Sequence, residues 1–318
     1  MERKKRRRSP SESNISGRKG SQALSKIINI LLIFLVGLAF RYYIAPNHPP
    51  VATGEVRVYM LDVGQGDACL IRTETMNVLI DGGEREQGDH LVRMLHALQV
   101  KKLDYVINSH PHYDHFGGLI SVFEEIPVGK LVMCDFPESL TPTSAYFETF
   151  LDVVEASGAA VSIPQCGDTL VLDDAVLTFL SVDNSNYTDL NDCSLLCRLD
   201  HQSVSFLFCG DLTAKGERDF VEQGLIAPAD VLKCAHHGSN SSTCAAFLAA
   251  VQPVCVGISA GLHNDYGHPS VKCLQRISQY TDEVYRTDLD GDVLFSSDGS
   301  TLKVTVHYQA DEVGKEAW

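Results

Sequence analysis

Three histidines and one aspartate fall within six consecutive positions of this chain, between His110 and His115. The segment follows an apolar run at residues 103–107, which predicts a buried strand, and precedes a Gly-Gly step where a helix can begin. Imidazoles and carboxylates suit zinc or manganese, and α/β proteins build their sites in loops that follow strands. The pattern therefore favours a metal site over a merely polar, histidine-rich loop. Its expected ligands are His110, His112, Asp114 and His115.

Four further polar groups occur along the chain, three of them directly after apolar, strand-like runs. In chain order they are Asp81, the pair Asn191-Asp192, Asp211, and the pair His236-His237. Each group alone is weak, because an aspartate beside glycine after a strand is also a common turn.

In this order the motifs resemble those of the metallo-β-lactamase superfamily, from about Glu55 to about Val306. His-x-His-x-Asp-His matches the central metal-binding motif of that superfamily letter for letter. Three segments are similar to its ComEC-type branch, a domain attached to competence DNA-uptake channels and also found as free-standing secreted or anchored proteins. They begin at Asp62 (Asp-Val-Gly-Gln-Gly-Asp), Asn191 (Asn-Asp-x-Ser) and Asn264 (Asn-x-Tyr-Gly-His-Pro).

The resemblance implies a site for two divalent metal ions. It gives Asp211 the place of an aspartate whose two oxygens hold both metals, and one histidine of the next pair closes the second metal site. We expect His236 to be that ligand, as the first residue after the strand, with His237 lining the pocket or exchanged with it in role. Asp81 is expected to orient the ligand loop through hydrogen bonds and not to bind metal directly.

The chain departs from the superfamily where a third histidine usually completes the first metal site. It has Asn191-Asp192 there instead, and His201 lies in a predicted hairpin turn, where we do not expect it to substitute. Asp192 is interpreted either as a ligand or as a group that supports the ligands. With one imidazole fewer, the site is more open or richer in oxygen, so manganese competes with zinc.

Other residues of these motifs are expected to act on the substrate. Asp114 and His268 are assigned catalytic roles, His268 as a proton donor to a leaving alkoxide or as a contact to a phosphate oxygen. An idle histidine in a helix-start turn is the alternative for His268. Ser239 is expected to contact a substrate oxyanion, or to cap a helix near residue 241. The full set of expected substrate contacts is Gln65, Asp67, Ser239 and Asn264.

The apolar periodicity alternates between strands and helices, with a helix expected at residues 87–98. This alternation supports an α/β layer arrangement. The resemblance implies the four-layer αββα metallo-β-lactamase fold over residues 55–308, preceded by a transmembrane helix.

The formal net charge of −15 is divided unevenly along the chain. Residues 1–26 carry nine basic and two acidic side chains, a balance of +7, which leaves −22 for the remainder. The remainder therefore lacks the basic surface expected of a protein that grips duplex nucleic acid.

An apolar run follows this basic segment and predicts a transmembrane signal-anchor over residues 27–45, with a linker at residues 46–54. The charge asymmetry places residues 1–26 in the cytoplasm and the catalytic domain outside a single-pass cell-membrane anchor. Secretion after signal-peptide cleavage is the alternative, although no convincing small-x-small site precedes the linker. Residues 309–318 are predicted to be a disordered tail.

Six of the ten cysteines lie in apolar, strand-like runs, where a thiol acts as a small buried hydrophobe. We therefore expect mostly free thiols, although an extracellular domain would usually form disulfides.

These observations predict an extracellular, membrane-anchored hydrolase in which two ions, Zn²⁺ or Mn²⁺, activate a shared hydroxide. The branch resemblance favours a phosphodiester substrate, with single-stranded DNA as the first candidate, and a link to DNA uptake. One alternative is a cell-wall or choline-phosphate esterase or another ester hydrolase. The other is a non-catalytic competence accessory protein, which would not need a complete ligand set. No protein partner is inferred.

Overall fold

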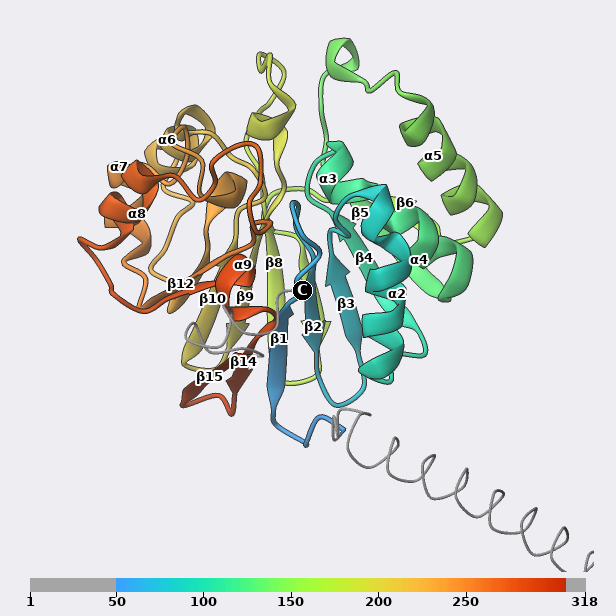
Figure 1. Ribbon diagram of the computed structural model, residues 1–318, viewed down its shortest axis with the longest axis horizontal. Helices are drawn as coiled ribbons and strands as arrows, with labels where there is room; N and C mark the ends of the chain where they lie inside the picture. Colours follow the sequence, from blue (N-terminus) through green and yellow to red (C-terminus); the bar gives the residue numbers. More distant parts are fainter. Residues whose placement is uncertain (1–49, 307–318) are drawn as a thin grey trace, which may run out of the picture. The chain divides into compact units, whose positions relative to one another are not determined.

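Two β-sheets form the centre of the fold in a computed structural model that describes residues 50–306 (Figure 1). The expected basic tail, membrane anchor and C-terminal tail lie outside the described residues. Among residues 50–306, no helix is both long enough and apolar enough to cross a membrane.

The first sheet contains eight of the described strands. In spatial order they are β15 (Leu302–Val306), β14 (Val293–Ser297), β1 (Val56–Met60), β2 (Cys69–Arg72), β3 (Asn77–Ile80), β4 (Leu103–Asn108), β5 (Val128–Met133) and β6 (Ala160–Ser162). The strands from β15 to β3 pair antiparallel, and the strands from β3 to β6 pair in parallel.

The second sheet contains the other seven described strands. In spatial order they are β13 (Val284–Arg286), β12 (Cys255–Ile258), β11 (Val231–Lys233), β10 (Val204–Phe208), β9 (Leu196–His201), β8 (Ala175–Leu180) and β7 (Thr169–Leu172). Here the strands from β13 to β10 are parallel, and those from β10 to β7 are antiparallel.

Helices follow the parallel strands of both sheets, as the sequence alternation predicts. They are α2 (Gly88–Ala97), α3 (Tyr113–Phe116), α4 (Leu119–Glu125), α5 (Ala145–Ser157), α6 (Ala214–Glu222), α7 (Ala245–Val251), α8 (Val271–Ile277) and α9 (Thr287–Asp290). The expected helix at residues 87–98 is therefore confirmed as α2.

Three clusters of buried apolar side chains show how these elements are layered. One contains residues of both sheets, such as Val58 and Phe206, and fills the space between them. A second packs α2, α4 and α5 on the first sheet, and a third packs α6, α7 and α8 on the second. The order is therefore helix, sheet, sheet, helix, which confirms the predicted αββα layers.

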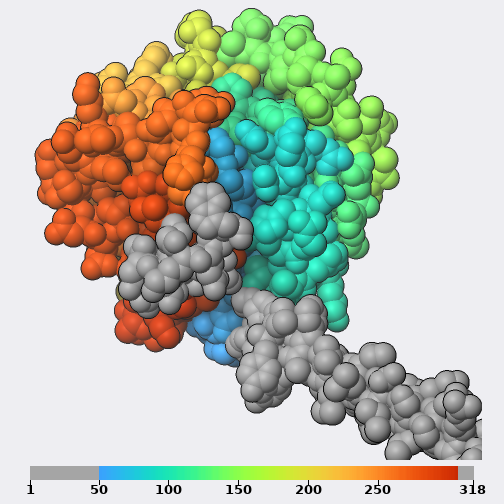
Figure 2. Space-filling model, in the orientation of Figure 1, coloured from blue at the N-terminus to red at the C-terminus, as the bar shows by residue number. Residues whose placement is uncertain are grey.

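Parallel pairing brings the polar strand ends to one edge. In the first sheet Ile80 lies opposite Ile107, so the chain leaves β3 and β4 on the same side. In the second sheet Phe208 lies opposite Lys233, and β10 and β11 likewise end together. Figure 2 shows the blue segment after residue 50 between the cyan segments of the first half and the orange segments of the second.

Candidate metal centre

Four side chains from both sheets converge at this edge. Asp114, His115, Asp211 and His237 each offer one ligand atom, and these atoms all lie within 4.8 Å of one another. His237 Nε2 lies 3.2 Å from Asp114 Oδ2 and 3.4 Å from Asp211 Oδ2, and His115 Nε2 lies 3.3 Å from Asp211 Oδ1. Such a mixed set of imidazole and carboxylate ligands suits zinc or manganese.

Two atoms of this cluster show that it fits a cation. His115 Nε2 and Asp211 Oδ1 are buried and make no hydrogen bond. A buried polar atom without a partner costs about 1–3 kcal/mol, so such atoms are rare in folded proteins. A cation between the nitrogen lone pair and the carboxylate oxygen would satisfy both.

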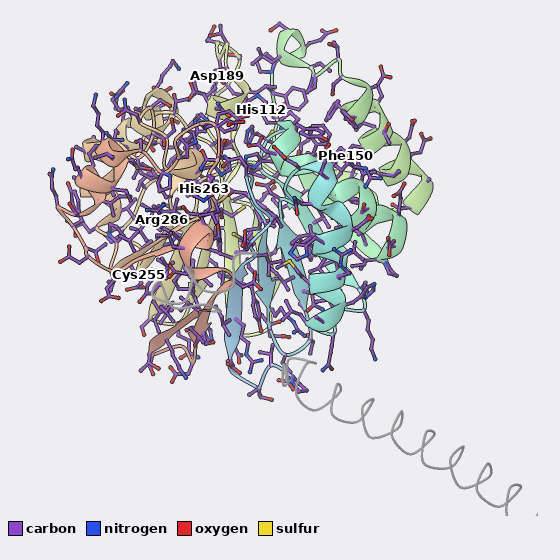
Figure 3. The ribbon with its side chains drawn as sticks, viewed as in Figure 1. His112, Phe150, Asp189, Cys255, His263 and Arg286 are labelled. Atoms are coloured by element: carbon purple, nitrogen blue, oxygen red, sulfur yellow. The ribbon has the colours of Figure 1, made fainter. Side chains whose placement is uncertain are left out.

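A second donor set adjoins the first. His110 Nε2 lies 3.0 Å from His112 Nδ1, and His112 Nδ1 lies 3.0 Å from Asn191 Oδ1. The ring centroids of His110 and His115 lie 4.2 Å apart, so the two donor sets are in contact through these rings. His112 lies at this edge of the sheets in Figure 3. The amide oxygen of Asn191 therefore stands where the superfamily usually has a third histidine.

Asp81 holds the first ligand loop in place, as expected. Its carboxylate accepts hydrogen bonds from Ser109 N (2.7 Å) and Ser109 Oγ (2.6 Å), and Oδ2 lies 2.9 Å from His115 Nδ1. With Nδ1 of His115 engaged by the carboxylate, Nε2 is left to face the metal cluster.

The backbone at the second ligand loop is strained. His236 and His237 both have φ of 52°, a left-handed conformation that residues other than glycine rarely adopt. Gly238 follows with φ of 79°, and a Cβ there would lie 2.5 Å from Pro269 Cβ. Strain of this kind persists only where the surroundings enforce it, and it clusters at functional sites.

The structure differs from the prediction for this histidine pair. His237 is 1% exposed and its Nε2 joins the cluster, whereas His236 Nε2 lies 3.7 Å from Asp211 Oδ2 with its side chain 24% exposed. Two consecutive left-handed residues turn the second ring inward, so position after the strand did not identify the inward-facing histidine. The alternative in which the two exchange roles fits the geometry.

Asp192 also differs from one of its two expected roles, because it is turned away from the donor sets. Its Oδ1 accepts hydrogen bonds from Thr213 N, Thr213 Oγ1 and Gly216 N at the start of α6. A carboxylate at the first turn of a helix satisfies N–H groups that have no partner within the helix. Asp192 therefore anchors α6, and its neighbour Asn191 reaches His112.

The four expected substrate contacts are largely engaged within the protein. Asp67 is 4% exposed and forms an ion pair with Lys233. Gln65 Oε1 accepts a hydrogen bond from Gly261 N, and the Asn264 side chain bonds four backbone groups of its own loop. Ser239 Oγ lies 3.0 Å from Ser241 Oγ. These side chains therefore shape the loops around the site, and their expected contacts to a substrate stay a prediction.

His268 faces the cluster, as expected. Its ring centroid lies 5.7 Å from that of His236 and 6.4 Å from that of His237, and its Nδ1 is buried without a partner. Burial and the two neighbouring imidazoles lower the pKa of His268 to about 4. The ring is therefore neutral at pH 7, which favours a hydrogen bond to a substrate oxygen over transfer of a proton.

Opposite charges set the ionisation of the cluster. Burial alone would lower the pKa of His115, but the surrounding carboxylates, led by Asp211, raise it well above its ordinary value. The pKa of His237 is raised in the same way, chiefly by Asp211 and Asp67. Conversely, the two histidines hold the pKa of Asp211 well below its ordinary value despite burial. Cations that bind here must therefore displace protons from His115 and His237.

His110 behaves in the opposite way. Burial and the adjacent His115 lower its pKa well below the ordinary value, so its imidazole is neutral. A neutral imidazole is the form that binds metal.

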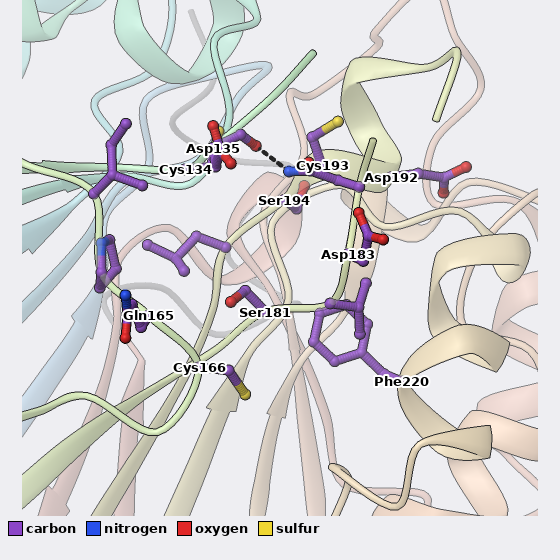
Figure 4. Close-up of a pocket in the computed structure, with 15 residues that line it drawn as sticks. Cys134, Asp135, Gln165, Cys166, Ser181, Asp183, Asp192, Cys193, Ser194 and Phe220 are labelled. Atoms are coloured by element: carbon purple, nitrogen blue, oxygen red, sulfur yellow. Dashed lines mark hydrogen bonds between the residues drawn. The ribbon is translucent and has the colours of Figure 1, made fainter. Parts of the chain in front are cut away.

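A cavity of about 490 Å³ is lined in part by residues 192–195, which follow Asn191, although none of the donor residues lines it (Figure 4). Three of its fifteen lining residues are acidic, Asp135, Asp183 and Asp192, and none is Lys, Arg or His. The cavity therefore disfavours a phosphate group and suits a neutral or cationic one.

The family model of the metallo-beta-lactamase superfamily matches residues 61–255, which is more than half of the chain. Together with the αββα layers and the donor sets at their edge, this shows that the chain belongs to the metallo-β-lactamase superfamily. Within the superfamily, the relatives described next place it in the ComEC-type branch.

ComE operon protein 3 of Bacillus subtilis is 30% identical over 77% of this chain, and Competence protein ComA of Neisseria gonorrhoeae is 32% identical over 77%. The chain covers 34% and 33% of these two relatives, about a third of their length. Among solved structures, the metallo-beta-lactamase fold protein YhfI of Bacillus subtilis is similar over 73% of this chain and 95% of its own, with 14% identity and a TM-score of 0.48.

Two residues of the site were not assigned a role from the sequence. Asn191 stood beside the expected Asp192, and only the need of α6 for a capping carboxylate distinguishes the two. Lys233 lay in a predicted strand, where a lysine among apolar neighbours was the one available signal.

Proposed function

We propose that the chain is a metal-dependent phosphodiesterase anchored at the outer face of the cell membrane, with single-stranded DNA as its first candidate substrate. The observation that supports this most strongly is the pair of adjoining donor sets, in which buried His115 Nε2 and Asp211 Oδ1 have no hydrogen-bond partner. A purely structural protein has no need for such atoms.

Divalent cations bound there would lower the pKa of a bound water and would supply the positive charge that polarises a phosphoryl oxygen. His110, His112 and Asn191 would hold one of them, and Asp114, His115 and His237 the other, with Asp211 between the two sets. Asp81 keeps His115 oriented through its bond to Nδ1. His268, neutral at pH 7, offers a hydrogen bond to a non-bridging or leaving oxygen.

The donor atoms bear on which metal the site prefers. The set of His110, His112 and Asn191 has two nitrogens and one amide oxygen in place of three nitrogens. Oxygen ligands suit manganese better than a third imidazole would, whereas the histidines suit both metals. We therefore propose manganese as a competitor of zinc in this set.

The relatives support nucleic acid as the substrate class. The name of the relative from Neisseria gonorrhoeae refers to competence, and that of a relative from Haemophilus influenzae, Recombination protein 2, refers to recombination. The balance of −22 outside the first 26 residues opposes a long polyanion. We therefore propose that a short single-stranded segment binds with one phosphate at the donor sets.

The acidic cavity favours a second candidate function. Asp135 and Asp183 line it together with Asp192, the residue after Asn191, and a substrate with a cationic alcohol, such as a choline-phosphate ester, would place its positive charge there.

The test uses the full chain in mild detergent, purified without chelator. Metal content is measured, together with hydrolysis of bis-(p-nitrophenyl) phosphate, single-stranded DNA and p-nitrophenylphosphorylcholine. We expect two equivalents of metal and hydrolysis of the first two substrates, both lost in Asp114→Ala. His201→Gln is the matched control, since His201 is buried at the opposite end of β9 and bonds Ser297.

Preferential hydrolysis of the choline ester without DNA cleavage would shift the proposal to the esterase. A chain that binds metal and hydrolyses none of the three would contradict both enzymatic proposals. A metal-free, inactive chain would instead favour the non-catalytic accessory role.

A further inference from the structure

A buried ion pair lies directly behind the metal cluster. Lys233, the last residue of β11, is 3% exposed, and its Nζ lies 2.7 Å from Asp67 Oδ2 and donates to Cys234 O at 2.9 Å. Asp67 is 4% exposed. Removing two charges from water costs several kcal/mol per ion before their attraction offsets it, so such a pair is weak support for stability alone.

The other oxygen of this carboxylate points to a metal-cluster histidine. Asp67 Oδ1 has no hydrogen-bond partner and lies 3.4 Å from His237 Nδ1. Ser259 O lies 3.1 Å from the same nitrogen. Two acceptors around Nδ1 fix a proton on that nitrogen, so that Nε2 faces Asp114 and Asp211 and would offer its lone pair to a cation bound between them.

The arrangement matches the one behind His115 in geometry but not in charge. There, Asp81 contacts His115 Nδ1, and its remaining capacity is taken by the neutral donors Ser109 and Asn108. Behind His237, the supporting carboxylate is instead held by an ammonium group. The carboxylate behind His115 is thus held by neutral donors, and the carboxylate behind His237 is held by a charged one.

The many carboxylates near the two histidines explain why the positive charge of Lys233 is useful behind His237. Asp67, Asp81, Asp114 and Asp211 are four carboxylates around two histidines. The positive charge of Lys233 offsets the negative charge of Asp67. Asp81, Asp114 and Asp211 then remain as the carboxylates around the cation sites.

Local geometry brings the pair together from both sheets. Asp67 ends the loop between β1 and β2, and Lys233 belongs to the second sheet. A Cβ at Gly66 would lie 2.4 Å from Asp114 O, so only glycine lets this loop approach the ligand segment so closely. The ion pair therefore links the loop that contacts Asp114 to the strand that precedes His237.

We propose that Lys233 and Asp67 are positioning residues for the metal centre, with Lys233 fixing the carboxylate that orients His237 toward its cation. The proposal rests on the proposed function, because it assigns this role toward the metals of that site. The competing explanation is that the pair only joins the two sheets.

The experiment compares Asp67→Asn, Lys233→Met and the double variant with the unmodified full chain. Mn²⁺ and Zn²⁺ are titrated calorimetrically into chelator-treated protein, and the melting temperature of the metal-free form is recorded. We expect each single variant to bind the second metal equivalent about 10- to 100-fold more weakly, as for other groups that orient ligands. His201→Gln is expected to leave both metal affinities unchanged.

The double variant separates charge from packing. Without Asp67's negative charge, the loss of Lys233 leaves no unpaired buried ion, so Lys233→Met combined with Asp67→Asn is expected to be more stable than Lys233→Met alone. Its metal affinity should stay below that of the unmodified chain, because asparagine is a weaker acceptor for His237.

The result that overturns the proposal is a lowered melting temperature in Asp67→Asn with both metal affinities unchanged, which is the signature of a purely structural link. If Lys233→Met does not fold, Asp67→Asn decides by the same criterion. Metals bound without hydrolysis of any ester would sink the proposed function and leave this proposal standing. An unmodified chain that binds no metal would overturn both.

Discussion

The two sheets contribute to the metal centre in different ways. The first sheet delivers four donors from one loop of six residues, His110 to His115, all placed by the end of β4. The second sheet delivers Asn191, Asp211 and His237 from three separate loops. Local backbone geometry suffices for the first group, whereas the second group needs the antiparallel pairing of β9 with β10 and the parallel pairing of β10 with β11 to bring its members together. Changes on the second sheet should therefore reveal most about how the site is assembled.

The largest expected effect comes from replacing each of the two adjacent histidines by alanine in turn. His237→Ala should lose one metal equivalent and reduce phosphodiester hydrolysis by about a thousandfold, since a bound cation supplies several kcal/mol of transition-state stabilisation. His236→Ala should retain both equivalents and lose about tenfold or less, because its ring lies at the rim of the site.

Metal analysis and kcat for the two variants check this prediction. The reverse result, with metal lost only in His236→Ala, would mean that the left-handed turn at residues 236–237 presents the other ring when cations are bound.

A smaller effect is expected where the second sheet replaces an imidazole by an amide. Asn191→His should raise zinc affinity relative to manganese by about tenfold, since imidazole is the better zinc ligand. Asn191→Ala should weaken one of the two metal equivalents for both ions. Competition titrations with Zn²⁺ and Mn²⁺ measure the ratio, and His201→Gln, at the opposite end of β9, is the control. An unchanged ratio in Asn191→His would show that this position lies outside the metal's reach.

The same contrast explains what the sequence predicts and what it does not. The His110–His115 motif follows from a local pattern, whereas the supporting role of Asp81 and the layer order follow from the family resemblance that the order of motifs carries. Asn191 and His237 do not, because a capping demand from α6 and two left-handed residues decide which neighbour faces inward. The Lys233–Asp67 contact spans 166 positions, and no local pattern relates the two residues.

The smallest expected effect is the pH dependence of the metal-free protein, to which each sheet contributes one histidine. The pKa values of His115 and His237 are raised in the folded state by the buried carboxylates, against the effect of burial. Each protonated imidazole therefore adds stability that is fully present below the unfolded pKa of about 6.5 and is lost as pH rises through the folded pKa.

Within that window each histidine should cost about 1.4 kcal/mol of unfolding free energy per pH unit. Urea unfolding of chelator-treated protein at pH 6 to 9 measures the slope. Metal-loaded protein should lack this decline, because both imidazoles are then unprotonated at every pH in the range. In Asp67→Asn the decline should shrink, since Asp67 raises the pKa of His237 and also offers a carboxylate oxygen within 4.8 Å of a ring nitrogen of His115. An unchanged decline in that variant would show that Asp67 stabilises neither protonated imidazole, and the alkaline loss would then depend on Asp81, Asp114 and Asp211 alone.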